Sequence, residues 1–158
     1  ISLGLVGSEM CIRDRIKGSE NKETNRRQVM RILIAEDDFA SRKAILKFLS
    51  AYGECDVTVD GMEAIDAFMM ALEEEDPYDL ICLDVMMPVM DGYQALKNIR
   101  DIEREHNVDP ADQARVIMTT ALNEEKNVKK AFELGCTVYC AKPIDLEKLK
   151  DMLEKLGF

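Results

Sequence analysis

Short apolar runs alternate along the chain with segments whose apolar residues recur at helical spacing. The runs at 31–35, 55–59, 80–83, 116–119 and 137–141 have the length and composition of buried strands. Each run is followed by a stretch in which apolar residues recur at the spacing of one helix face. Strands that alternate with helices in this way are typical of βαβ units. The pattern therefore predicts a doubly wound α/β domain with a five-stranded parallel sheet.

The same spacing predicts which side of each helix faces the core. The expected core-facing residues are Ile45, Phe48, Leu49 and Tyr52; Ile65, Phe68, Met69 and Leu72; Leu96, Ile99 and Ile102; Val128, Ala131 and Phe132; and Leu146, Leu149, Leu153 and Leu156. Asn123 and Asp145 stand where helix N-caps belong, and Gly135 stands where a left-handed residue ends a helix. The polar connection 104–115 predicts a longer surface loop.

The first 28 residues show no sustained apolar period. We expect a disordered tail over residues 1–28 and one domain over residues 29–158. Residues 2–14 resemble peptides that arise when sequencing-adaptor DNA is translated. If the tail has this origin, Met30 is the native start. A signal peptide is the alternative, but the apolar part at 1–6 is short and no basic residue precedes it.

The composition limits which classes of ligand and which cellular compartment we expect for this protein. The chain carries 21 Lys and Arg against 31 Asp and Glu, a net charge of −10, which is the wrong sign for neutralising nucleic-acid phosphates. No apolar run approaches the roughly 20 residues of a membrane helix. The cysteines are odd in number and include no C-x-x-C pair, which argues against a disulfide framework or a zinc knuckle. We expect three or four buried free thiols and a cytoplasmic protein.

Polar groups follow four of the five predicted strands. They are Glu36-Asp37-Asp38 after the first strand, Asp84 after the third, Thr119-Thr120 at the end of the fourth and Lys142 after the fifth. Ligands of parallel α/β sheets bind beyond the carboxyl ends of the strands, where the strand order reverses. Each group alone has an ordinary structural explanation, such as a carboxylate that caps the next helix. Together they predict a site at this edge of the sheet.

Converging carboxylates call for a cation. Carboxylates about 5 Å apart repel each other by roughly 3 kcal/mol at an effective dielectric constant of about 20. Oxygen ligands without His or Cys favour Mg²⁺ over zinc. Such a site suits phosphoryl transfer, because its catalysis consists of positioning and charge neutralisation, and a carboxylate can be the nucleophile. Lys142 would add a second positive charge and Thr120 a hydroxyl donor.

These residues resemble a known family. Glu36-Asp37, the segment 84–92, Thr120-Ala121 and Lys142-Pro143 are similar to the motifs of the receiver domain of response regulators. The resemblance covers residues 30–158 and all five predicted strands in order. It implies a flavodoxin-like, CheY-like (βα)5 fold with strand order 2-1-3-4-5.

The resemblance also assigns roles at the acidic edge. Asp84 is expected to be the phosphoacceptor. Asp37, Asp84 and the backbone carbonyl of Met86 are expected to bind Mg²⁺, with Glu36 holding the metal mostly through water. Asp38 matches a variable position and is expected to be a flanking residue or a helix cap.

The remaining roles concern the phosphoryl group and the switch. The resemblance implies that Thr120 and Lys142 contact the phosphoryl group and that the peptide bond from Lys142 to Pro143 is cis. Tyr139 matches the switch aromatic, whose ring turns inward with the Thr120 hydroxyl and changes the face formed by the last two helices and the fifth strand. Ordinary sheet packing of Tyr139 is the alternative.

Met86 and Leu122 are apolar at positions where some relatives carry polar groups that position the hydrolytic water. We therefore expect slow loss of the phosphoryl group from this chain. The long connection before the fourth strand and the acidic run 73–76 also depart from commoner members, and both are expected to be surface elaborations.

We expect a stand-alone receiver that takes phosphate from a histidine kinase or a histidine phosphotransfer protein and signals by binding another protein. It is expected to be a monomer or a transient dimer and to catalyse only its own phosphorylation and dephosphorylation. Two alternatives of the same fold are a relay intermediate that passes phosphate to a second histidine and an unphosphorylated binding module. Flavin enzymes and aspartyl-phosphate hydrolases are disfavoured, because no Gly-rich or Ser-rich loop follows the first strand and no D-x-D pattern begins at Asp84.

Overall fold

The structure is a computed structural model that describes residues 29–121 and 125–158. Five parallel strands form one sheet in the order β2-β1-β3-β4-β5. The strands are β1 (Met30–Ala35), β2 (Gly53–Thr58), β3 (Leu80–Asp84), β4 (Arg115–Thr120) and β5 (Val138–Ala141). The predicted fold class and the strand order implied by the resemblance are both confirmed.

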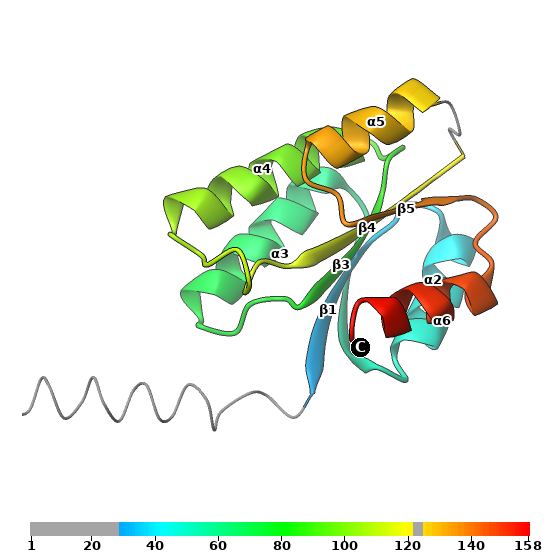
Figure 1. Cartoon of the computed structure of the whole chain (residues 1–158), viewed down its shortest axis with the longest axis horizontal. Helices are drawn as coiled ribbons and strands as arrows, with labels where there is room; N and C mark the ends of the chain where they lie inside the picture. The colour runs from blue at the N-terminus through cyan, green and yellow to red at the C-terminus, as the bar shows by residue number, and fades with distance from the viewer. Residues whose placement is uncertain (1–28, 122–124) are drawn as a thin grey trace, which may run out of the picture.

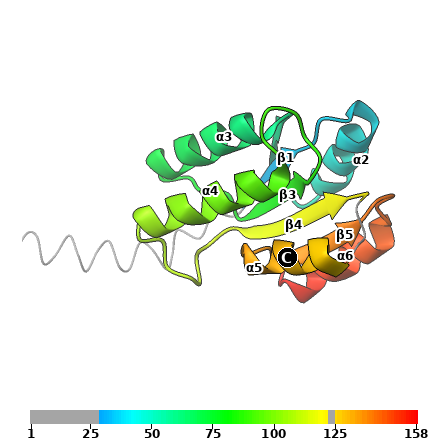
Figure 2. The same ribbon diagram turned by 90° about the horizontal axis from the view of Figure 1, so that it is seen from above.

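Helices cover both faces of the sheet. They are α2 (Phe39–Leu49), α3 (Gly61–Glu73), α4 (Gly92–Glu105), α5 (Glu125–Glu133) and α6 (Leu146–Lys155). Figures 1 and 2 show α2 and α6 on one side of the sheet and α3, α4 and α5 on the other. The fold is therefore doubly wound, as predicted. None of the helices in the described part of the chain is long and apolar enough to cross a membrane.

The sheet separates two hydrophobic clusters. Alternate residues of the central strands point to opposite sides, so Ile81 and Leu83 belong to the cluster under α3, α4 and α5. Leu80 and Cys82 belong to the cluster under α2 and α6. Every residue of β3 is buried, which is why this strand reads as a continuous apolar run.

The predicted helix faces are wrong at three residues. Met69 is 38% exposed, Phe132 49% and Leu146 42%. On α3, Phe68 is buried as predicted, and the other buried residues are Gly61, Ala64 and Ala71. Small side chains fit where this helix packs closely, and a prediction that follows only large apolar residues misplaces the buried face by about one residue.

The residues predicted to begin and end the helices agree better with the structure. Asp145 caps α6 by accepting hydrogen bonds from the amides of its first turn, and Asp38 caps α2 in the same way. Gly135 has φ of 98° just after α5, as predicted for a left-handed residue. The long connection between α4 and β4 is confirmed. Asn123 lies outside the described residues.

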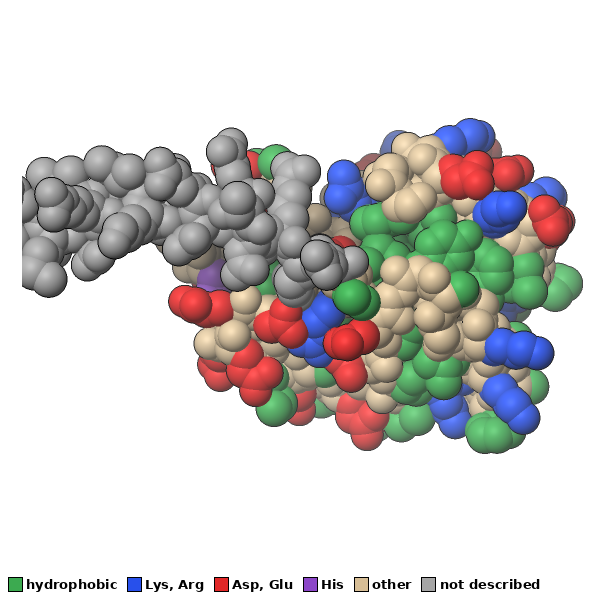
Figure 3. Space-filling view, turned by 90° about the horizontal axis from the view of Figure 1, so that it is seen from below, with side chains coloured by type: hydrophobic (Ala, Val, Ile, Leu, Met, Phe, Trp, Pro, Cys, Tyr) green, Lys and Arg blue, Asp and Glu red, His purple; other side chains and the backbone are tan. Residues whose placement is uncertain are grey.

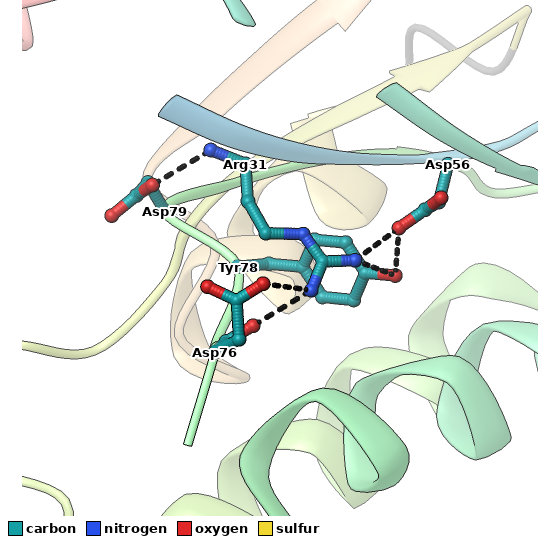
Figure 4. Close-up of polar contacts among 5 residues, drawn as sticks. All are labelled: Arg31, Asp56, Asp76, Tyr78 and Asp79. Atoms are coloured by element: carbon teal, nitrogen blue, oxygen red, sulfur yellow. Dashed lines mark hydrogen bonds and ion pairs between the residues drawn. The ribbon is translucent and has the colours of Figure 1, made fainter. Parts of the chain in front are cut away.

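An ion-pair network joins the amino-terminal part of the sheet (Figure 4). The Arg31 guanidinium contacts the carboxylates of Asp56 and Asp76 and lies 4.7 Å over the ring of Tyr78. The Tyr78 hydroxyl donates to Asp56 at 2.6 Å, and the Arg31 amide donates to Asp79 at 2.8 Å. Together these contacts, which we call the Arg31 network, connect β1, β2 and the segment before β3.

A shallow apolar groove lies between α2 and α6. It is lined by Ala44, Lys47, Phe48, Ala51, Tyr52 and Leu146. The groove is on the side of the molecule that Figure 3 views, where apolar side chains gather among charged ones. The exposed Leu146 belongs to this groove rather than to the core beneath it.

Candidate functional site

The acidic residues converge where the strand order reverses. Glu36 and Asp37 directly follow β1, and Asp84 is the last residue of β3, which pairs with β1. Because β1 and β3 are neighbours in a parallel sheet, their carboxyl ends meet at one edge. One carboxylate oxygen from each of Glu36, Asp37 and Asp84 lies within 4.8 Å of the others. The predicted acidic cluster is therefore present.

Burial differs sharply within this cluster. Glu36 is 1% exposed and Asp84 is 3% exposed, whereas Asp37 is open to solvent. Two buried carboxylates side by side are costly unless a positive charge accompanies them. The cluster thus combines a buried pair with an exposed carboxylate at its mouth.

Lys142 supplies the positive charge. Its Nζ lies 2.7 Å from Oε2 of Glu36 and 3.3 Å from Oδ2 of Asp84. Burial lowers the pKa of the Lys142 ammonium, but its hydrogen bond to Glu36 and the charge of Asp84 raise that pKa by more, so the pKa is raised overall. Lys142 therefore stays protonated at neutral pH and bridges the two buried carboxylates.

The Asp84 carboxyl group has a strongly raised pKa. Burial raises its pKa first, the negative charge of Glu36 raises it further, and Lys142 opposes both, so the pKa reaches about 7. Near neutral pH the carboxyl group is thus balanced between its charged and neutral forms. A perturbed carboxyl group in an acidic cluster is typical of a functional site.

The segment after β3 holds Asp84 in place. The Met86 amide donates to Oδ1 of Asp84 at 3.3 Å, and the Gly92 amide donates to the Val85 carbonyl at 2.9 Å. A Cβ at Gly92 would lie 2.2 Å from the carbonyl oxygen of Asp84, so only glycine permits this close approach. The Met86 side chain is 60% exposed. Leu122 lies outside the described residues, so slow phosphoryl loss stays a prediction.

The two threonines at the end of β4 differ in position. Thr119 pairs with Asp84 in the strand register and lies two residues after Ile117, which belongs to the cluster under α2 and α6. Thr120 lies two residues after Met118, which belongs to the cluster under α3, α4 and α5. By strand alternation, the two threonines therefore face opposite sides of the sheet. Both threonines are buried, and the Thr120 carbonyl accepts a hydrogen bond from the Lys142 amide at 2.7 Å. The role expected of the Thr120 hydroxyl stays a prediction.

Tyr139 is half-buried and packs against the cluster under α3, α4 and α5. It meets Tyr93, a residue that the sequence analysis did not single out. Burial and the hydrogen bond with Tyr139 raise the pKa of Tyr93. The Tyr93 hydroxyl also donates to the Asn127 carbonyl at 3.3 Å, and Lys130 Nζ lies 4.5 Å over its ring. No sequence pattern could have found this contact, because it joins three separate elements.

The donor set fits a magnesium ion. Glu36, Asp37, Asp84 and the Met86 carbonyl offer only oxygen atoms, which are the ligands that Mg²⁺ prefers. Asp37 and Met86 lie at the exposed mouth, where a hydrated ion with bound waters can be accommodated. The peptide bond from Lys142 to Pro143 is cis, as the resemblance implied.

Comparison with known families and curated proteins agrees with this geometry. Residues 32–154 match the response regulator receiver domain family. Chemotaxis protein CheY of Treponema pallidum is 30% identical over 125 residues, covering 78% of this chain and 79% of that protein. Probable transcriptional regulator ycf29 of Porphyra purpurea is 31% identical over 126 residues, covering 79% of this chain but 55% of that protein. The chain thus spans about half the length of the latter relative.

Solved structures of similar fold include complexes. A chain of the CheX-CheY-BeF3-Mg complex from Borrelia burgdorferi has a TM-score of 0.70 at 27% identity, covering 82% of this chain and 90% of that chain. A chain of the Saccharomyces cerevisiae co-crystal of the phosphotransfer protein Ypd1 with the Ssk1 receiver domain has a TM-score of 0.69 at 26% identity, covering 80% and 88% respectively.

Proposed function

Since this chain belongs to the family of response regulator receiver domains, we propose that it is a phosphoacceptor of two-component signalling and that Asp84 accepts the phosphoryl group. One observation carries this proposal: the buried Asp84 carboxyl group lies beside Glu36 and Asp37 and within 3.3 Å of the Lys142 ammonium. A carboxylate with a purely structural role would not require these charged neighbours.

The reaction is transfer from a phosphohistidine donor. An oxygen of ionised Asp84 attacks phosphorus, the new P–O bond forms as the P–N bond breaks, and the electron pair stays on the donor imidazole. Asp37, Asp84, the Met86 carbonyl and, through water, Glu36 would hold Mg²⁺, which would neutralise charge on the phosphoryl oxygens when bound. Lys142 turns from Glu36 and from the Asp84 carboxyl oxygen to the phosphoryl group and stabilises its added charge.

Switching follows from the new charge beside Thr120. The Thr120 hydroxyl donates to a phosphoryl oxygen, and Tyr139 moves with it. The changed surface comprises α5, β5 and α6, which binds the downstream protein. The partly buried position of Tyr139 against the cluster under α3, α4 and α5 supports this role, because the ring contacts the core and the surface at once.

The phosphate donor is a histidine kinase or a histidine phosphotransfer protein. Phe39, Met86 and Val89 are 67%, 60% and 81% exposed on the segments that follow β1 and β3, so the mouth of the site offers apolar contact to a donor. The co-crystal of Ypd1 with the Ssk1 receiver shows that a similar domain binds such a protein. Transfer onward to a second histidine uses the same residues and remains the alternative within this proposal.

The protein acts as a monomer or transient dimer in the cytoplasm, where buried thiols such as Cys82 and Cys140 stay reduced. It catalyses only its own phosphorylation and dephosphorylation, because the nucleophile is part of the chain and is itself the group that is phosphorylated.

The decisive experiment is incubation with acetyl phosphate and Mg²⁺ followed by measurement of the intact mass. The wild-type protein should gain one phosphoryl group and Asp84→Asn none. Asp66→Asn, which removes an exposed carboxylate on α3, is the matched control and should be phosphorylated like the wild type. Failure of the wild type to gain mass, or phosphorylation of Asp84→Asn, contradicts the proposal.

A further inference from the structure

The Thr119 hydroxyl is an unusual group for the interior of a sheet. Thr119 is 1% exposed, and its Oγ1 has no hydrogen-bond partner among residues 29–121 and 125–158. Most buried hydroxyl groups in proteins are hydrogen-bonded, because burial without a partner costs the full hydration of the group. An isosteric valine would avoid that cost, so the hydroxyl needs an explanation in some other state of the protein.

The neighbours of Thr119 are fixed by the strand register. Asp84 lies beside it on β3, and Cys140 lies beside it on β5. Paired residues of parallel strands project to the same side of the sheet. The carboxyl group of Asp84 is therefore the adjacent strong acceptor. Leu83 and Met118, the residues just before Asp84 and Thr119, belong to the cluster under α3, α4 and α5, so by strand alternation Asp84 and Thr119 lie on the side that α2 and α6 cover.

The present contacts of Asp84 explain why no bond joins the two side chains. Oδ1 of Asp84 accepts from the Met86 amide at 3.3 Å, and Oδ2 lies 3.3 Å from Lys142 Nζ. Each carboxylate oxygen is thus drawn toward a donor other than Thr119. A phosphoryl group on Asp84 competes for the ammonium of Lys142, which releases the carboxyl oxygen that Lys142 now contacts.

We propose that Thr119 is a positioning residue for Asp84: its buried hydroxyl donates a hydrogen bond to the Asp84 carboxyl group once phosphorylation draws Lys142 away. This inference rests on the proposed phosphorylation of Asp84. It assigns different tasks to adjacent threonines, with Thr120 serving the phosphoryl oxygens and Thr119 serving the carboxyl group to which they are attached.

The test compares Thr119→Val with Thr119→Ser, which keeps the hydroxyl, in thermal unfolding and in binding of beryllium fluoride with Mg²⁺. Without ligand, Thr119→Val should unfold at the same temperature as the wild type or higher, because an unpaired hydroxyl has been removed. With beryllium fluoride, Thr119→Val should need roughly three- to tenfold more ligand, the range for one hydrogen bond, and Thr119→Ser should behave like the wild type.

Thr58→Val is the matched control. Thr58 is also buried, but its hydroxyl donates to the Ile34 carbonyl at 3.3 Å, so this variant should be destabilised without ligand. The Thr119 proposal is overturned if Thr119→Val binds beryllium fluoride as the wild type does, or if it loses unliganded stability as Thr58→Val does. If the wild type itself neither binds beryllium fluoride nor gains phosphate, the proposed function fails and this inference fails with it.

Discussion

At the scale of single residues, the raised pKa of Asp84 has a cost in stability at neutral and higher pH. Its pKa is about 7 in the folded protein against 3.8 for an ordinary aspartate, because of burial and the charge of Glu36. Between these values the folded chain binds more protons than the unfolded chain. The contribution of Asp84 to stability is therefore fully favourable below pH 4 and is lost as the pH rises through 7.

This dependence of stability on pH predicts how Asp84→Asn behaves in unfolding by urea without Mg²⁺. The amide cannot ionise, so the variant should be more stable than the wild type by roughly 1–3 kcal/mol at pH 8. The difference should shrink as the pH falls toward 4, where the wild-type carboxyl group is protonated. Asp66→Asn is the control, and its effect should stay small throughout. A stabilisation by Asp84→Asn that is constant with pH would show that repulsion is not its cause.

At the scale of elements, the sequence predicts strands better than helix faces. Every strand was found within two residues of its expected bounds. The central strands β1, β3 and β4 are largely buried and therefore stand out as apolar runs, whereas the edge strand β2 is mostly exposed. On α3, the prediction placed Met69 in the core, but the structure buries Ala64 and Ala71 instead. Small residues carry little hydrophobic signal, although they permit the closest packing of helices.

The candidate site shows the same division. The carboxylates and Lys142 could be predicted, because each stands directly after a strand. Thr119 and Tyr93 could not be assigned, since their roles depend on strand register and on contacts between separate elements. A pattern along the chain shows the periodicity of each element, but it does not show which residues of neighbouring strands lie side by side.

Tyr93 gives a prediction at this scale, because its hydroxyl connects α4 to α5 through the Asn127 carbonyl. Tyr93→Phe keeps the ring but removes that contact. We expect a loss of about 1 kcal/mol in stability and faster amide hydrogen exchange in α5. Tyr52→Phe, at the groove between α2 and α6, is the control and should leave exchange in α5 unchanged. Unaltered exchange in Tyr93→Phe would show that the hydroxyl does not hold α5.

At the scale of the whole molecule, two polar clusters lie toward opposite ends of the strands. The acidic site lies beyond the carboxyl ends, and the Arg31 network joins the amino-terminal part of the sheet (Figure 4). The side chain of Arg31 is 16% exposed and contacts two carboxylates, so the network supports the sheet where no reacting group is present.

This separation predicts that Arg31→Met reduces stability without affecting the site. We expect a loss of roughly 1–3 kcal/mol in urea unfolding, because the carboxylates of Asp56 and Asp76 lose the Arg31 guanidinium. Binding of beryllium fluoride with Mg²⁺ should equal that of the wild type. Arg104→Met, which removes a 74% exposed side chain from a surface pair, is the control and should change neither quantity. Weaker binding by Arg31→Met would show that the two ends are energetically coupled.

The positions of the two consecutive threonines bear on how a change at the site could reach the rest of the fold. Thr119 and Thr120 are consecutive, yet strand alternation directs them to different layers of the fold. If Asp84 is phosphorylated as proposed, a displacement of either threonine would reach the other through a single peptide unit. Both faces of the sheet could then respond to one event at the site without any sliding of whole strands.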